Sequence, residues 1–91
     1  MDDLKNLLEV RVISPKDVIF TGFAKSVSSR NSMGKFDILP RHANFITLVN
    51  QQPITIIKST GQSVSFKFDV AIVYTVNNKV NIYTNLQLSL V

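Results

Sequence analysis

The sequence predicts an all-β protein, an antiparallel sandwich or barrel of about eight to ten short strands. Apolar and polar residues alternate over many short segments, and turn-forming residues separate these segments at near-regular spacing. No stretch has the period and length of an amphipathic helix. With 91 residues, 45% of them apolar, the chain has room for one modest core and a single domain, residues 1–91.

The chain opens with a short lead-in and a first strand. Residues 1–7 carry leucines at helical spacing and are expected to form at most one helical turn. From Leu8 the pattern alternates over residues 8–13, as in a strand with one buried face. A turn is expected at residues 14–17, because serine, proline and aspartate all favour turns.

Two further strands and a loop are expected next. Residues 18–20 pair back on the first strand, and Gly22 permits a bend or a bulge. Residues 24–29 alternate more weakly, with small polar residues, before a loop tip at residues 31–34. This tip presents Met33, an apolar residue, to the surroundings.

The most distinctive part of the sequence is residues 34–47, where an apolar strand is interrupted by a corner. Pro40 cannot donate a hydrogen bond to a neighbouring strand, so it predicts a strand end at the surface. Arg41 and His42 follow it and are expected to point outward. The chain then resumes as a strand over residues 45–49.

The remaining sequence predicts two hairpins. Residues 54–57 are β-branched throughout and favour an extended strand, and Gly61 closes a hairpin to residues 64–68. Residues 70–76 are apolar enough to predict a central strand covered on both faces. A second hairpin is expected at Asn77-Asn78, because asparagine tolerates positive φ angles.

Alternation also indicates which residues form the core. The last long strand is expected to bury Val80 and Ile82, and leucines at positions 86, 88 and 90 follow it. The full set of residues expected in the core is Val12, Phe20, Phe36, Ile38, Ile56, Phe66, Val73, Val80 and Ile82.

The charge pattern argues for scattered solubilising residues with one exception. The formal net charge is +4, and most lysines are spread one per strand or turn. Only Arg30, Lys35 and Arg41 are expected to lie near one end of the sandwich, because the loop and the Pro40 corner flank the same short strand.

Catalysis, metal binding and cofactor binding are not predicted. The chain has no cysteine and one histidine, too few ligands for a metal site, and no glycine-rich phosphate loop precedes a helix. A serine, His42 and Asp37 lack any motif that would assemble them as a triad. His42 is expected either to contact a partner or to bond a neighbouring carbonyl group.

Nucleic-acid binding is a third interpretation that the sequence disfavours. Phe66 and Phe68 flank Lys67, as in some base-stacking surfaces. Alternation places both rings on one face and Lys67 on the other, which a core face beneath a solvated lysine explains better.

The sequence from Gly34 to Ala43, Gly-Lys-Phe-Asp-Ile-Leu-Pro-Arg-His-Ala, resembles the signature of the epsilon subunit of F-type ATP synthases, called delta in mitochondria. Segments around Ile13-Ser14-Pro15, Phe20-Thr21-Gly22 and Asn77-Asn78 are similar to the same family, so the likeness runs from about Leu8 to Asn85. It implies the flattened two-sheet sandwich of the family's N-terminal domain. The family's C-terminal helical hairpin is expected to be absent from this chain.

The resemblance implies a noncatalytic rotor subunit that fastens the gamma subunit to the membrane ring of c subunits and couples proton or ion translocation to ATP synthesis. The residues matching the family's ring-facing loop are Arg30, Asn31, Ser32, Met33, Gly34 and Lys35. The residues matching gamma-facing positions are Ser14, His42, Ala43 and Thr47.

This chain departs from the family pattern at several positions. Lys35 stands where an acid is usual, and Arg41 and Asn44 replace a glycine and a proline that flank the histidine and alanine. Ala71-Ile72 stands where a glycine pair normally opens a strand, so a glycine-dependent bulge is not expected there.

The resemblance also implies where the chain works. The expected location is a peripheral membrane complex on the cytoplasmic side of a bacterial inner membrane, or on the matrix or stroma side in an organelle. Membrane association is expected only through the complex, and no nucleic-acid partner is expected. The alternative is a β-sandwich interaction module that uses the same scaffold for another partner.

Overall fold

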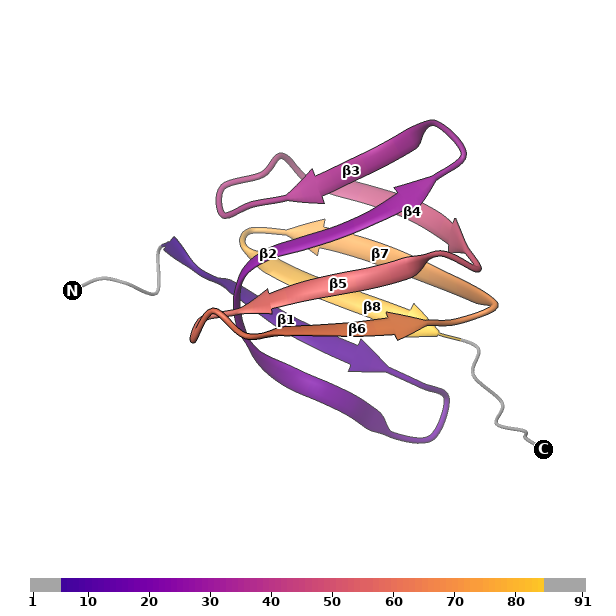
Figure 1. The fold of residues 1–91 in the computed structure, drawn as a ribbon, viewed down its shortest axis with the longest axis horizontal. Coiled ribbons are helices and arrows are strands. Elements are labelled where there is room, and N and C mark those ends of the chain that lie inside the picture. Colours follow the sequence, from indigo (N-terminus) through magenta and orange to yellow (C-terminus); the bar gives the residue numbers. More distant parts are fainter. Residues whose placement is uncertain (1–5, 85–91) are drawn as a thin grey trace.

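The computed structural model describes residues 6–84, which are folded almost entirely into strands (Figure 1). The eight strands are β1 (Leu8–Ile13), β2 (Val18–Asn31), β3 (Gly34–Ile38), β4 (Phe45–Asn50), β5 (Pro53–Lys58), β6 (Ser63–Lys67), β7 (Val70–Val76) and β8 (Lys79–Thr84). The all-β prediction is therefore confirmed. The predicted helical turn at residues 1–7 falls mostly outside the described residues, as do the leucines at positions 86, 88 and 90.

The strands form two layers that share β2. Hydrogen bonds order the strands as β4-β7-β8-β1-β2-β5-β6, with β3 on β2. The first layer contains β4, β7, β8, β1 and the start of β2, and the second contains β3, the end of β2, β5 and β6. In Figure 1, β5 and β6 lie in front of β1 and β8. Six of the seven pairings are antiparallel, and the pairing of β1 with β8 is parallel.

The sequence predicted two short strands where the structure has the single long strand β2. Gly22 does not interrupt it, because Gly22 stays paired with Val10 of β1. The break in register falls instead between Ala24 and Ser26, where β2 exchanges β1 for β5 as its neighbour. A strand that changes layer needs such an irregularity, since regular pairing would hold it in one sheet.

The core lies between the layers and matches most of the prediction. Fully buried residues include Val12, Ile38, Ile56, Val73, Val80 and Ile82, all predicted from alternation. The three predicted phenylalanines Phe20, Phe36 and Phe66 are only partly buried and pack against this core.

Those three rings sit where the edges of the two layers meet. Phe36 of β3 faces Phe45 of β4, with ring centroids 5.4 Å apart. Phe20 of β2 meets Phe66 of β6 edge to face, with centroids 5.9 Å apart. Each pair joins an edge strand of one layer to the other layer, so aromatic contacts close both sides of the sandwich.

The prediction that residues 70–76 are covered on both faces is wrong. β7 is central in its sheet, between β4 and β8, and it buries Ala71, Val73 and Thr75. Ile72 and Tyr74 point the other way and are 40% and 41% exposed. In a two-layer sandwich, nothing covers the outer face of either sheet. A strand with a hydrogen-bonded neighbour on each side can therefore still be buried on one face only.

The predicted turns are confirmed. Ser14 accepts hydrogen bonds from the backbone N–H groups of Lys16 and Asp17. Gly61 has φ 96°, and Asn77 and Asn78 have φ 51° and 63°, as the second hairpin requires. β7 pairs with both neighbours without a register shift, in keeping with the absence of a glycine pair at Ala71-Ile72.

Within residues 6–84, the structure contains no helix with the length and apolarity to cross a membrane.

The aromatic pair between the layers gives a stability prediction. Replacing Phe66 with alanine should lower the free energy of unfolding by about 2 to 4 kcal/mol, at or below the usual cost for a fully buried ring because Phe66 is only partly buried. Urea unfolding at equilibrium measures this change. Phe23→Ala is a matched control, because Phe23 is 43% exposed on the outer side and should cost less than about 1 kcal/mol. Equal losses in the two variants would contradict this account of the core.

Candidate functional site

The six residues predicted for a ring-facing loop form one hairpin between β2 and β3. Asn31 pairs with Gly34, and the Asn31 side-chain oxygen accepts the backbone N–H of Met33 at 2.8 Å. Gly34 has φ 122°, a conformation that side chains rarely adopt. These local contacts hold Met33 at the tip with 92% of its surface exposed, beside Ser32. The structure therefore brings together Arg30, Asn31, Ser32, Met33, Gly34 and Lys35.

Thr47 links this hairpin to the other predicted set. The Asn31 side-chain amide donates a hydrogen bond to Thr47 Oγ1 at 2.9 Å. Thr47 is on the inward side of β4 and is only partly exposed. The bond fastens the end of β2 to β4 across the two layers.

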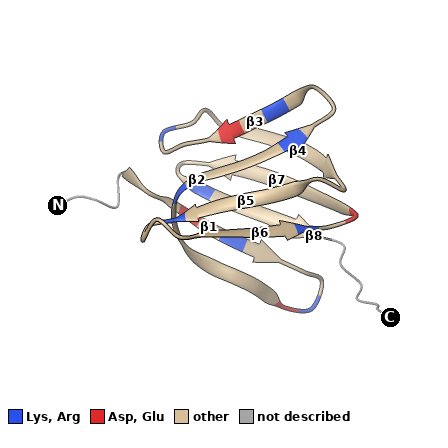
Figure 2. Ribbon diagram, viewed as in Figure 1, with Lys and Arg blue, Asp and Glu red and all other residues tan. Residues whose placement is uncertain are grey.

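Arg41 does not join Arg30 and Lys35, contrary to the prediction from sequence. Arg30 and Lys35 are opposite each other in the β2–β3 ladder, close to the hairpin tip. Arg41 lies beyond the far end of β3, in the β3–β4 connection. Figure 2 shows a basic segment in that connection, away from the basic segments of β3 and of the end of β2. An extended strand separates its two ends by its full length, at about 3.3 Å per residue, so the five residues of β3 keep Arg41 away from the hairpin tip.

Two backbone N–H groups hold the Pro40 corner in place through hydrogen bonds. Arg41 has φ 70°, and its backbone N–H donates to Asn78 Oδ1 at 2.6 Å, which ties the corner to the β7–β8 hairpin. The His42 backbone N–H donates to the Leu39 carbonyl at 3.0 Å.

The His42 ring is also fixed. Its Nδ1–H donates to the Ala43 carbonyl at 2.7 Å, and the ring packs edge-on against Phe45 with centroids 5.4 Å apart. This is the neighbouring-carbonyl arrangement that the sequence allowed. With Nδ1 bonded in this way, Nε2 is the ring nitrogen that could accept a hydrogen bond from a partner. Ala43 is exposed.

Ser14 lies far from His42. It sits in the β1–β2 turn, where its hydroxyl both donates to the Asp17 carbonyl and accepts two backbone N–H groups. Figure 1 shows the β1–β2 connection and the β3–β4 connection at opposite corners of the molecule. Ser14 and His42 therefore cannot form one compact site, although both flank the first layer.

Between these corners runs an exposed apolar surface that the sequence analysis missed. It occupies the outer side of β4, β7 and β8 and is called here the outer apolar face: Ile46, Leu48, Ile72, Tyr74 and Tyr83. Leu48 pairs with Ile72, which pairs with Tyr83, so the side chains are contiguous across three strands. Their exposed fractions range from 40% to 66%. The sequence carries no clear signal for it, because β7 has apolar residues on both faces and alternates only in burial.

Two other kinds of site, a metal centre and a base-stacking platform, are absent from the described residues. No group of three or more His, Cys, Asp or Glu side chains in residues 6–84 could hold a metal ion. The rings of Phe66 and Phe68 stack on each other with centroids 5.9 Å apart, and Phe68 is buried, so these rings do not present a platform for bases. An exposed apolar face and a polar hairpin are instead features of protein-contact surfaces.

Comparisons with known proteins agree with this description. The sequence model of the family described as "ATP synthase, Delta/Epsilon chain, beta-sandwich domain" matches residues 7–87. The ATP synthase epsilon chain of Wolinella succinogenes is 35% identical over 60 residues, covering 66% of this chain and 46% of that protein. The epsilon chain of Endomicrobium trichonymphae is 34% identical over 77 residues, covering 85% and 55%. The chain thus spans about half the length of these relatives.

Solved structures show the same fold. A chain of the Euglena gracilis mitochondrial ATP synthase, in a structure of OSCP, F1 and c-ring, superposes with a TM-score of 0.80 at 11% identity, over 87% of this chain and 51% of that one. A chain of the central stalk and c-ring of the Tetrahymena thermophila mitochondrial ATP synthase gives 0.71 at 15% identity, over 86% and 63%. The family match covers nearly all described residues, and the chain belongs to the ATP synthase delta/epsilon family through its β-sandwich domain.

Proposed function

We propose that this chain is a noncatalytic subunit of the central stalk of an F-type ATP synthase, which fastens the gamma subunit to the c-ring. In that position it helps to couple proton or ion translocation to ATP synthesis, on the cytoplasmic side of a bacterial inner membrane or its organellar counterpart. The observation that carries the proposal is the pair of separate contact regions, the outer apolar face and the β2–β3 hairpin, on one small sandwich.

The outer apolar face is the region we assign to gamma. Its five side chains form a continuous surface across β4, β7 and β8, and apolar surfaces of this kind are typical of permanent interfaces. The residues that match gamma-facing positions border the same layer: Ser14 follows β1, and His42 and Ala43 precede β4. Gamma would then cover a whole sheet face, which explains why those residues need not touch one another.

The β2–β3 hairpin is the region we assign to the c-ring. Met33 projects from its tip with Arg30 and Lys35 behind it, so the contact combines one apolar side chain with positive charge. Ring loops that meet it would offer acidic groups or carbonyl oxygens. The Asn31–Thr47 hydrogen bond joins this hairpin to β4, which belongs to the gamma side.

A part that transmits torque must be stiff between its two contacts. Here β2 pairs with β1, β3 and β5, so the hairpin is continuous with both layers. A displacement at the hairpin is passed to the first layer through backbone hydrogen bonds, which deform little compared with a flexible linker.

The assignment to gamma is tested by Ile72→Lys, at the centre of the outer apolar face. Burying a lysine there should weaken binding to the cognate gamma subunit by about tenfold or more, as expected for a central interface residue. Isothermal calorimetry measures the affinity, and the thermal midpoint shows whether the fold is kept. Met33→Lys makes the same change at the hairpin and should leave gamma binding unchanged. If Ile72→Lys binds gamma like the parent chain, the face has another partner or none, as for an interaction module.

The assignment to the ring is tested by Lys35→Glu. Reversing this exposed charge should weaken assembly with the gamma and c-ring complex modestly, and most strongly at low salt, because charges at an interface rim act through screened electrostatics. Co-sedimentation of the reconstituted complex at two salt concentrations measures it. Lys67→Glu, at the end of β6 in the second layer, is the charge-matched control. Identical behaviour of Lys35→Glu and the parent at both concentrations would show that Lys35 is an ordinary solvated lysine.

A further inference from the structure

Arg30 and Lys35 form an unusual pair on the outer side of the second layer. They are direct cross-strand partners in the β2–β3 ladder, and both are exposed. Like charges directly opposite each other destabilise a sheet. Neither side chain makes an ion pair or a hydrogen bond with another residue of the described part of the chain. No direct ion pair within the described residues therefore offsets the repulsion between the two cations.

A hollow adjoins this pair for a specific structural reason. The ladder between β2 and β5 ends at Ser28 and Thr55, and the next outward position on β5 is Pro53, which has no N–H to continue it. Ser29 Oγ instead donates to the Pro53 carbonyl at 2.8 Å. The strands part beyond this point and leave a shallow hollow of about 460 Å³ between them.

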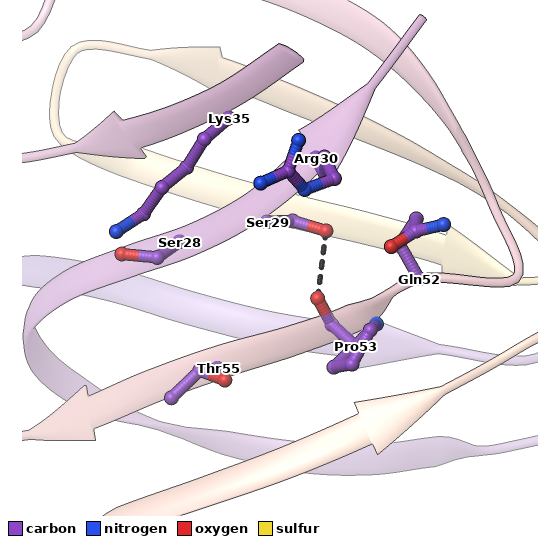
Figure 3. A pocket seen from close by; sticks show the side chains of 7 residues that line it. All are labelled: Ser28, Ser29, Arg30, Lys35, Gln52, Pro53 and Thr55. Carbon is purple, nitrogen blue, oxygen red and sulfur yellow. Dashed lines mark hydrogen bonds between the residues drawn. The ribbon is translucent and has the colours of Figure 1, made fainter.

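Three free donors surround the hollow. Figure 3 shows the Lys35 ammonium group reaching toward Ser28, and the Arg30 guanidinium group lying between Lys35 and Gln52. The Gln52 amide, like the two cations, has no hydrogen-bond partner among the described residues. Ser28 and Thr55 contribute hydroxyl groups, which already bond to Asp37 and Ser65 respectively.

We propose that Arg30, Lys35 and Gln52 form a binding site for a phosphate group. Phosphate suits these donors because its several oxygens can bridge a guanidinium fork and an ammonium group at once. Its charge, about −1.5 to −2 for a monoester at neutral pH, matches two cations better than a single carboxylate does. A bound phosphate would attract both Arg30 and Lys35, and this attraction would offset the repulsion between the two side chains.

Asp37 limits the affinity of the site. Its carboxylate lies two residue pairs along the β2–β3 ladder, opposite Ser28, and accepts the Ser28 hydroxyl at 2.6 Å. The local charge is thus two cations against one carboxylate. Because the hollow is open to solvent and the ligand small, we expect dissociation constants in the range of about 1 to 10 mM for inorganic phosphate.

The phosphate can come from a soluble molecule or from a lipid headgroup. Met33, 92% exposed at the hairpin tip two residues before Lys35, would contact the apolar region of a membrane surface in the second case. The site does not depend on the chain being a stalk subunit, so it can be tested on the 91-residue chain alone.

The test is a titration of the ¹⁵N-labelled chain followed by NMR. Sodium phosphate should shift the Arg30 side-chain and Gln52 amide signals in a saturable way, and should raise the thermal midpoint, while sodium chloride and sodium acetate at equal ionic strength should not. Arg30→Gln and Lys35→Gln should each weaken binding about tenfold, the usual effect of losing a charge-assisted donor. Asp37→Asn should tighten it, and Lys79→Gln, at the opposite hairpin, should leave it unchanged.

A second arm separates the two sources. Vesicles of phosphatidylcholine with and without phosphatidylglycerol are sedimented with the parent chain and with Arg30→Gln. Sedimentation that needs both phosphatidylglycerol and Arg30 identifies a lipid headgroup, whereas shifts with inorganic phosphate alone identify a soluble ligand. The proposal is overturned if chloride reproduces the shifts, if Lys79→Gln weakens binding as much as Arg30→Gln, or if acetate equals phosphate, which would indicate an acidic partner instead.

Discussion

The sandwich depends on a single strand that belongs to both of its layers. β2 is 14 residues long, pairs with β1 along its first half, and pairs with β3 and β5 along its second. Without that sharing, the two sheets would be joined only by loops and by contacts between side chains. The phenylalanine pairs then close the two sides where the layers' edge strands meet, and the fully buried aliphatic residues fill the space between. The relative position of the hairpin and the first layer is set by backbone bonding, so surfaces on different layers keep a fixed geometry.

The outer sides of the two layers have become chemically different. The first layer presents the contiguous apolar side chains of β4, β7 and β8, whereas the second presents hydroxyl groups, with Ser28 opposite Thr55 and Thr55 opposite Ser65. Alternate residues of each strand point away from the core, so their side chains are not constrained by core packing. These outward side chains can contact a partner protein or water. The first surface suits a large apolar interface and the second a polar or ionic one.

Much of this architecture follows from local sequence, and the errors have identifiable causes. Strand positions, turn residues and the aliphatic core were predictable from alternation, as at Val80 and Ile82. Strand length was not, because Gly22 is locally compatible with both a break and a continuous strand, and only its pairing with Val10 decides. The position of Arg41 depended on the direction and length of β3, and the exposure of Ile72 on the number of layers. These are properties of the assembled sheet that no short segment encodes. The hollow beside Arg30 likewise requires knowing that β2 and β5 separate at Pro53.

The parallel pairing of β1 with β8 sets the order in which the molecule can form. Val10 pairs with Val80 and Val12 with Ile82. The first sheet is therefore complete only when β8, the last described strand, has paired with β1. β1 and β2 can form a hairpin early, and β5 and β6 another, but each would expose one apolar edge or face until β7 and β8 arrive. Such distant contacts slow folding, because the entropy of closing the long loop is lost before burial compensates for it. During synthesis the incomplete chain therefore exposes apolar surface that β7 and β8 later cover, and exposed surface of this kind favours aggregation.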